Sequence, residues 1–424
     1  MRNPKPKTKN GLSPELLDLV ESIRKHEGEF FNKPKPCPSC GSEKLGKHDV
    51  DDRLFCKLIV DGGFEDVWVK VRRFYCKKCG KVFPADLFYP DCVYSSPVVD
   101  LCLYLAASNP PNRVERILID FGIQVDRDTV RRYTKLFEEK LEELAGIKLM
   151  GESLGVNFVK ALFECGTIEE LKEEKGEEFF ESCHDETYPA KKGAKKEMKE
   201  ENRRRKSEGK KKIPYPEGFC AAFSYVPSHG FYASSVIGDL NFNFLLAKVL
   251  LAPTEGADWR ITDRNPSYED FDTWKCLFHL FRSEMNGDEM LNLLNEELPH
   301  LIPNYLSEKY EEFRKEKLEK LKEERPDLFE NGEFKGSLTT NAMEGGNWRL
   351  KYELRTAYSS VETISGRMNF IALLESLYTF KNGKPCESWA HQHSDFELRD
   401  VMNIQIVKPK TRTFENPPNQ GENQ

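Results

Sequence analysis

The sequence lacks any run of about 18 apolar residues, the length that a membrane-spanning helix requires. The first 20 residues are basic, but they contain no long apolar stretch followed by a small-residue cleavage site, as a secretory signal would. We therefore expect a cytoplasmic protein with no membrane partner. A chain of 424 residues is long enough for two or three domains with a sizeable core.

The composition is not that of a small, disulfide-rich secreted protein, because the twelve cysteines are spread over a long chain. Two Cys-x-x-Cys motifs, CPSC at 37–40 and CKKC at 76–79, are separated by 35 residues of alternating, β-prone sequence. Zinc prefers four soft ligands at tetrahedral corners, and each motif supplies two of them from one tight turn. We predict a zinc ribbon over 37–92 that binds one Zn2+ through Cys37, Cys40, Cys76 and Cys79.

An excess of positive charge is also absent, since the net charge is −7, but this average conceals a basic block. Residues 191–212 hold twelve Lys or Arg against four Glu, a local charge of +8. One interpretation is a solvated loop, and another is an arm that contacts nucleic-acid phosphates; the two are compatible. In the second case the DNA-binding candidates in the block are Arg203, Arg204 and Arg205.

A short helix is predicted over 13–27 in an N-terminal segment, 1–36, and three helical segments follow the ribbon over 96–146. The last of the three opens at Asp126, a good N-cap. Its start carries four cations that suit the third helix of a helix-turn-helix domain over 93–148, namely Arg127, Arg131, Arg132 and Lys135. The alternative is a plain helical bundle that connects two domains.

From about residue 150 the pattern becomes α/β. A rather polar strand over 178–188 contains Asp185, two hairpin-like strands follow over 218–240, and a helix over 242–252 leads to a strand that ends at Asp263. This order is that of an RNase H-like core, in which the first and fourth strands lie side by side and bring both carboxylates together. We predict such a catalytic domain over 149–400, with a basic insertion at 190–213.

The second half adds charged helical segments, which predict a helical insertion over about 280–335. The stretch "TTNAMEGGNWRLK" follows at 339–351. In it, Glu344 is either the cap of a helix that starts at Thr340 or Asn341, or a metal ligand. Trp348, Arg349 and Lys351 follow Glu344. In one interpretation Trp348 stacks on a base and the two cations bind phosphates. In the other, Trp348 lies in the core and the two cations are solvated. The polar residues 401–424 predict a disordered tail.

Four stretches together resemble the DDE transposases of prokaryotic insertion sequences, and most closely the Mutator-like group. They are "DET" at 185–187, "ITDRNPSYEDF" at 261–271, "CLFH" at 276–279 and "TTNAMEGGNWRLK" at 339–351. The resemblance implies that Asp185, Asp263 and Glu344 bind two Mg2+ or Mn2+ ions. It also implies a nucleoid-associated enzyme that cleaves and joins DNA at terminal inverted repeats, acting on double-stranded DNA as a homo-oligomer.

Some features depart from the family pattern. The strand before Asp185 is less apolar than expected, and the basic insertion after it is unusual. Glu186 is adjacent, but alternation along a strand points it away, so Asp185 is preferred. Cys276 and His279 lack a second ligand pair and stay outside the metal list. Two other functions remain open: a non-catalytic, domesticated DNA-binding regulator and a plain metal-dependent nuclease.

Overall fold

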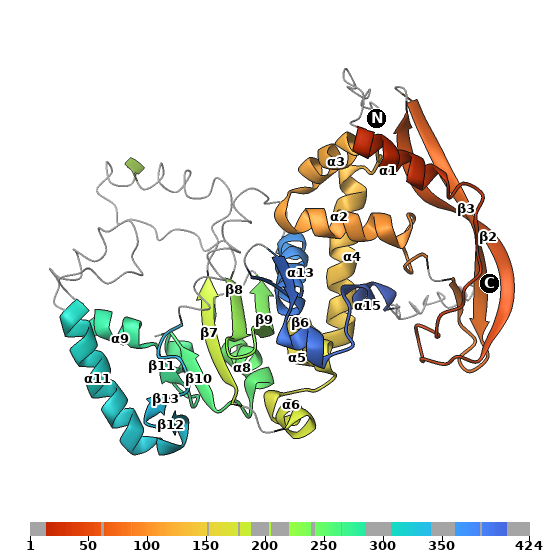
Figure 1. Cartoon of the computed structure of the whole chain (residues 1–424). Coiled ribbons are helices and arrows are strands. Elements are labelled where there is room, and N and C mark those ends of the chain that lie inside the picture. The colour runs from red at the N-terminus through yellow and green to blue at the C-terminus, as the bar shows by residue number, and fades with distance from the viewer. Residues whose placement is uncertain are drawn as a thin grey trace, which may run out of the picture.

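The computed structural model describes residues 14–60, 63–85, 87–150, 152–176, 179–187, 203–204, 220–238, 242–263, 265–284, 307–340, 361–381 and 384–404. Figure 1 shows an elongated molecule with a long β-ribbon at one end, a group of helices in the middle, and a sheet with a helical extension at the other end. The fold is mixed α/β, and its main sheet contains both parallel and antiparallel pairs. No described helix is both long and apolar enough to cross a membrane.

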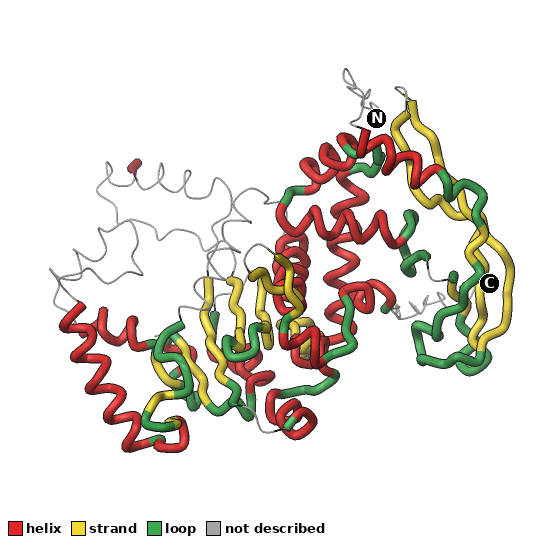
Figure 2. The backbone as a smooth tube through the Cα atoms, viewed as in Figure 1, coloured by secondary structure: helices red, strands yellow, loops and turns green. Residues whose placement is uncertain are grey.

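The ribbon is a sheet in the order β1-β3-β2, with β4 paired to β3. Its long hairpin is the pair of extended strands on the right of Figure 2. Val67, Val69 and Val71 are buried while Trp68 and Lys70 between them are exposed, as alternation along a half-buried strand predicts. The elements of this part are α1 (Pro14–Arg24), β1 (Phe30–Phe31), β2 (Leu45–Val60), β3 (Gly63–Cys76) and β4 (Val82–Pro84).

The three predicted helices after the ribbon are confirmed as α2 (Ser96–Ser108), α3 (Pro111–Asp120) and α4 (Arg127–Ala145). Asp126 caps α4 as predicted, because its side chain accepts from the backbone N–H groups of Asp128 and Thr129. The ribbon is joined directly to this unit. The N–H of Ile59 donates to the carbonyl of Gly122, and the N–H of Gln124 donates to that of Lys57, each at 2.8 Å.

The main sheet has the order β11-β10-β7-β8-β9-β6-β5. β7, β8 and β9 are antiparallel neighbours, whereas β10 is parallel to both β7 and β11. Its strands are β5 (Gly146–Leu149), β6 (Glu152–Asn157), β7 (Glu181–Thr187), β8 (Cys220–Val226), β9 (Phe231–Gly238), β10 (Trp259–Thr262) and β11 (Trp274–Lys275). The accompanying helices are α5 (Phe158–Phe163), α6 (Ile168–Lys175), α8 (Phe244–Leu251), η1 (Ala252–Thr254) and η2 (Pro266–Tyr268).

A helical extension follows β11. Its packing is aromatic, because the ring of Phe281 lies edge-on to Tyr310 at 5.2 Å and tilted against Phe313 at 5.5 Å between centroids. The extension comprises α9 (Leu277–Glu284), α11 (Ser307–Glu324), η4 (Pro326–Leu328) and a small hairpin of β12 (Phe329–Glu330) and β13 (Glu333–Phe334). These elements agree with the predicted helical insertion, although the sequence had not indicated the hairpin.

Helix α13 (Val361–Leu377) joins the helical unit to the sheet. Residues 365–373 are all buried, so this helix has no solvent-facing side there. Buried Arg367 donates to the carbonyls of Ala106 and Ala107 at the end of α2, at 2.6 and 3.0 Å. Gly366 allows close contact with α4, since a Cβ at this position would lie 2.8 Å from the carbonyl oxygen of Thr134.

The chain after α13 forms β14 (Tyr378–Lys381), β15 (Lys384–Glu387), α14 (Trp389–His393) and α15 (Leu398–Asn403). α15 extends three residues into the range that was predicted to be a disordered tail. The prediction was wrong there because Val401 and Met402 are buried in the core. The carbonyl of Met402 accepts from the buried Lys140 ammonium on α4 at 3.0 Å. The rest of that range, 405–424, lies outside the described residues.

Candidate metal centres

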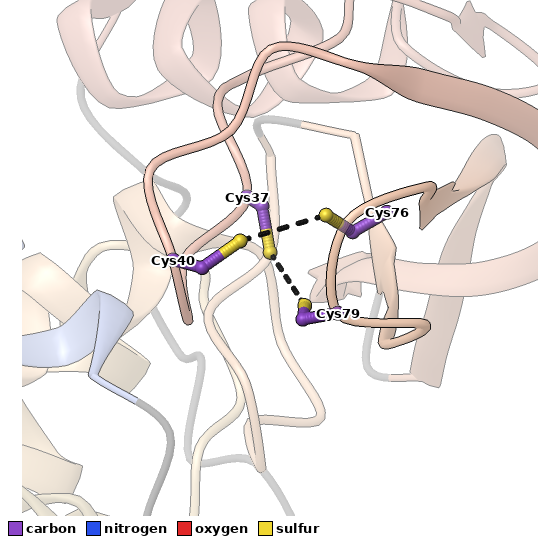
Figure 3. Close-up of side chains that lie close together, drawn as sticks. All are labelled: Cys37, Cys40, Cys76 and Cys79. Carbon is purple, nitrogen blue, oxygen red and sulfur yellow. Dashed lines mark hydrogen bonds between the residues drawn. The ribbon is translucent and has the colours of Figure 1, made fainter.

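The first candidate centre is the group of four cysteines predicted from the two Cys-x-x-Cys motifs. Cys37 and Cys40 come from the turn before β2, and Cys76 and Cys79 come from the turn that ends β3. Both turns bring their sulfur atoms to one point between them (Figure 3). Hydrogen bonds fix the first turn, in which the N–H of Gly41 donates to the carbonyl of Cys37 at 2.8 Å.

The sulfur geometry fits a tetrahedral metal. Sγ of Cys37 lies 3.5 Å from that of Cys79, and Sγ of Cys40 lies 3.6 Å from that of Cys76. A tetrahedron with zinc–sulfur distances of about 2.3 Å has edges of about 3.8 Å. The backbone N–H groups of Cys79 and Lys78 lower the pKa of Cys76 to about 6, whereas burial and the neighbouring thiols raise the pKa of Cys40 to about 11, so Cys76 is the thiol that ionises more readily. This group therefore has the composition and spacing to bind zinc.

The second candidate centre lies at the carboxyl edge of β7 and β10. These two strands are parallel, with His184 opposite Thr262, so Asp263 follows β10 beside Asp185. Each of Asp185, Glu186 and Asp263 offers a carboxylate oxygen, and the three oxygens lie within 4.8 Å of one another. All three residues are half-buried. We call these residues the acidic cluster; it has the hard oxygen donors that a divalent cation prefers.

Glu186 was considered from the sequence and rejected in favour of Asp185, but the structure groups it with Asp185 and Asp263. Alternation along β7 predicts opposite faces for Asp185 and Glu186, yet a carboxylate oxygen of each lies in the acidic cluster. The loop after β10 receives Glu186 there: the Asn265 amide donates to its Oε1, and the Tyr268 hydroxyl lies 3.4 Å from Oε2. The feature of the sequence that could have indicated a role for Glu186 was the polar stretch Asn-Pro-Ser-Tyr after Asp263.

The electrostatics of the acidic cluster favour cation binding. Burial, together with the charges of Asp263 and Asp185, raises the pKa of Glu186 to about 8. Asp263 is oriented by its own loop, because its Oδ1 accepts from the N–H of Asn265 at 2.8 Å. Three carboxylates at this separation repel one another until a proton or a cation is bound between them.

Behind the acidic cluster, His184 forms a buried polar link. Its Nδ1 lies 2.6 Å from the hydroxyl of Ser224 on β8, and its Nε2 lies 2.9 Å from the hydroxyl of Ser182. Ser224 also donates to the carbonyl of Leu250 at the end of α8, at 3.0 Å. Burial lowers the pKa of His184 to about 3, so the imidazole is neutral and the link is structural.

The cations predicted on α4 are exposed at the start of that helix. Arg131 donates to Asp128 at 2.8 Å, and Lys135 lies 3.8 Å from Glu139, so acids on the same helix already pair with them. The guanidinium of Arg132 lies 5.4 Å from the ring centroid of Tyr133, and that of Arg127 lies 3.8 Å from Asp128. Arg203 and Arg204 are exposed as well.

The structure does not describe the remaining predicted site residues. Glu344, Trp348, Arg349, Lys351 and Arg205 lie outside the described residues. Within the described part, the predicted pair Asp185 and Asp263 is brought together, and Glu186 joins it. No protein-family model matches this chain, and no curated protein matches it significantly.

Proposed function

We propose that the protein is a metal-dependent enzyme of the DDE transposase type, which binds the ends of a DNA element and catalyses strand cleavage and strand transfer. The observation that carries this proposal is the acidic cluster at the carboxyl edge of two parallel strands. Ligand and catalytic groups gather at such edges in open α/β sheets.

The sheet topology supports an RNase H-like core. In such a core three antiparallel strands come first, and two parallel strands are then added beside the first of them. The order β9-β8-β7-β10-β11 has this arrangement, because β7, β8 and β9 are antiparallel and β10 and β11 run parallel to β7. β5 and β6 would then be an extension of the core beyond β9.

Asp185 and Asp263 would hold the divalent ions, with Glu344 as the carboxylate that the described residues do not include. Mg2+ or Mn2+ bound there would lower the pKa of the attacking water or 3′-hydroxyl and stabilise the leaving oxygen. Glu186 would hold the loop that carries Asp263 and contribute negative charge to the same site. The exposed start of α4, and the basic block at 191–212, would contact phosphates of double-stranded DNA.

The test is nicking of duplex DNA that carries the sequences flanking the coding region, with Mg2+ or Mn2+ present. Asp185→Asn and Asp263→Asn should lose at least 100-fold in nicking rate while DNA binding and folding persist, because an amide is a poor ligand for a hard cation. Asp270→Asn is the matched control, since Asp270 is exposed in the same loop and outside the acidic cluster.

Nicking by the two cluster variants at the rate of the Asp270→Asn protein would contradict the proposal. A wild-type protein that binds these DNA ends tightly but never cleaves them would instead favour a DNA-binding regulator. Cleavage without any preference for the flanking sequences would favour a plain nuclease.

A further inference from the structure

Residues 336–340, which we call the 336–340 segment, lie against the start of β7 and β10. The N–H of Ser337 donates to Oε2 of Glu181 at 2.6 Å, and the indole N–H of Trp259 donates to the carbonyl of Ser337 at 2.7 Å. Further along, Sγ of Cys183 lies 4.0 Å from the carbonyl oxygen of Thr339. Glu181 and Cys183 alternate on the same face of β7 as Asp185. The segment therefore follows that face of β7 toward the acidic cluster.

Cys276 connects this segment to the end of β10. Its N–H donates to the carbonyl of Thr262 at 2.8 Å, and Thr262 is the residue before Asp263. Its sulfur accepts from the N–H of Thr340 at 3.4 Å. Cys276 and Thr340 are both completely buried. One residue thus ties the strand end that carries Asp263 to the 336–340 segment, and the N–H of Leu277 adds a bond to the carbonyl of Leu338 at 2.8 Å.

The third residue after Cys276 is His279, and its side chain forms a hydrogen bond with the Cys276 sulfur. Cys276 directly precedes α9, and His279 lies in the first turn of that helix. Residues three apart are neighbours on a helix surface, so the imidazole reaches the sulfur. Burial alone would raise the pKa of Cys276, but hydrogen bonds from the His279 side chain, the His279 backbone and Thr340 outweigh it and lower the pKa. The sulfur is therefore a strong acceptor for the N–H of Thr340.

We propose that Cys276 and His279 are positioning residues of the acidic cluster. They hold the end of β10, and with it Asp263, against the 336–340 segment on the Asp185 face of β7. A second zinc site is the competing explanation for a Cys-x-x-His pair. Among the described residues, however, no further His, Cys, Asp or Glu lies close enough to form a metal-binding group with these two. This inference rests on the proposed function in one respect, the binding of a divalent cation by the acidic cluster.

The experiment compares Cys276→Ala, Cys276→Ser and Cys102→Ala in the full chain. Cys102 is the matched control, because it is equally buried but lies on α2, away from the acidic cluster. One measurement is the affinity for Mn2+ by calorimetry. The Mn2+ binding that is lost in Asp263→Asn is assigned to the acidic cluster. The other is hydrogen–deuterium exchange at the amide of Thr340.

We expect Cys276→Ala to weaken Mn2+ binding about tenfold or more, as loss of an orienting partner does at metal sites. Cys276→Ser keeps an acceptor and should retain most of the affinity, and Cys102→Ala should bind Mn2+ like the wild type. The Thr340 amide should exchange faster in Cys276→Ala alone. A variant that combines Cys276→Ala and His279→Ala should lose clearly less Mn2+ affinity than the sum of the losses in the two single variants, because the two residues act through one link.

Two results would overturn the inference. One is a Mn2+ affinity of Cys276→Ala equal to that of Cys102→Ala, and the other is unchanged exchange at Thr340. If the wild type binds no Mn2+ at the acidic cluster, the proposed function fails separately. The exchange result alone then decides whether Cys276 holds the 336–340 segment.

Discussion

Glu138 on α4 is a buried carboxyl group with no cation as its partner among the described contacts. The Ser365 hydroxyl donates to its Oε1, and the Asn369 amide donates to both oxygens at 3.0 and 3.1 Å. Ser235 on β9 in turn donates to Oδ1 of Asn369 at 2.7 Å. Burial raises the pKa of Glu138 to about 7, and the charge of Glu142 on the same helix adds to the effect.

A raised pKa makes stability depend on pH in a defined direction. Below about 4.5 both the folded and the unfolded chain hold the proton, and between about 4.5 and 7 only the folded chain does. The stability that protonated, buried Glu138 contributes is therefore lost progressively as the pH rises from about 4.5 through 7. Each pH unit in this window is worth about 1.4 kcal/mol, so the wild type should lose on the order of 3 kcal/mol relative to Glu138→Gln between pH 4.5 and 7.5.

Urea unfolding of both proteins across this pH range measures the difference. Glu142 and all other groups titrate in both proteins, so the difference isolates Glu138. Glu139→Gln is the control, because Glu139 is exposed and one position along the same helix. A difference that stays constant with pH would show that Glu138 is already ionised in the folded protein.

The residues of the acidic cluster show how far sequence reasoning reaches at this scale. Asp185 and Asp263 were identified because a strand pattern placed each at a strand end, and the parallel pairing of β7 and β10 brings them together. Glu186 was rejected on alternation, a rule for side chains inside a sheet. At the strand end its position depends on the donors of Asn265 and Tyr268, which are remote in sequence.

At the scale of elements, the ribbon gives a prediction about zinc. Cys76→Ala should remove the metal, and the wild type should carry one zinc per chain, because a structural site needs all four thiolates. Elemental analysis of the purified proteins measures this. The variant should also lose thermal stability, since a zinc ion bound by all four thiolates links the turn before β2 to the turn that ends β3.

Cys56→Ala provides the control for zinc content. Cys56 is completely buried on β2 in the same ribbon, but its sulfur lies outside the group of four. It should keep zinc while losing some packing energy, about 1–2 kcal/mol for a removed buried group. Equal zinc in Cys76→Ala and Cys56→Ala would remove the group of four from the list of metal sites.

Periodicity predicted the long elements and missed those that depend on distant partners. The ribbon strand β3, the helices α2 to α4 and the strands β8 to β10 follow local hydrophobic patterns. β11 has only two residues and exists because it pairs with β10. α13 carries Arg367 and Asn369, which look like surface residues, yet both are buried because the acceptors on α2 and α4 come from far along the chain.

At the scale of the whole molecule, the proposed DNA interface depends on which cations remain available to phosphates. On α4, Asp128 pairs with Arg131 and Arg127, and Glu139 pairs with Lys135. Arg132 is the exposed cation of the four for which the structure shows an aromatic rather than an acidic contact. We predict that Arg132→Ala makes the slope of log affinity against log salt less negative by about 0.9, the value for one lost phosphate contact on duplex DNA.

Asp128→Asn should act in the opposite direction, because it removes a negative charge from the same surface and releases Arg131 for phosphates. Fluorescence anisotropy with duplex DNA at several salt concentrations measures both slopes. Arg314→Ala is the control, since Arg314 is an exposed cation on α11 that pairs with Glu311. An Arg132→Ala slope equal to that of the control would place α4 outside the DNA interface and favour a helical bundle.

The place of α13 in the chain bears on how the protein is made. Roughly 200 residues separate the end of α4 from the start of α13, which corresponds to about 10–40 s of translation. Throughout this delay the carbonyls of Ala106 and Ala107 and the carboxyl group of Glu138 have no partner from α13. The nascent helical unit is consequently exposed to chaperones and proteases until the ribosome has passed residue 377. A premature stop before that point would leave these acceptors on α2 and α4 without the donors of α13, even though all three helices of the unit had been synthesised.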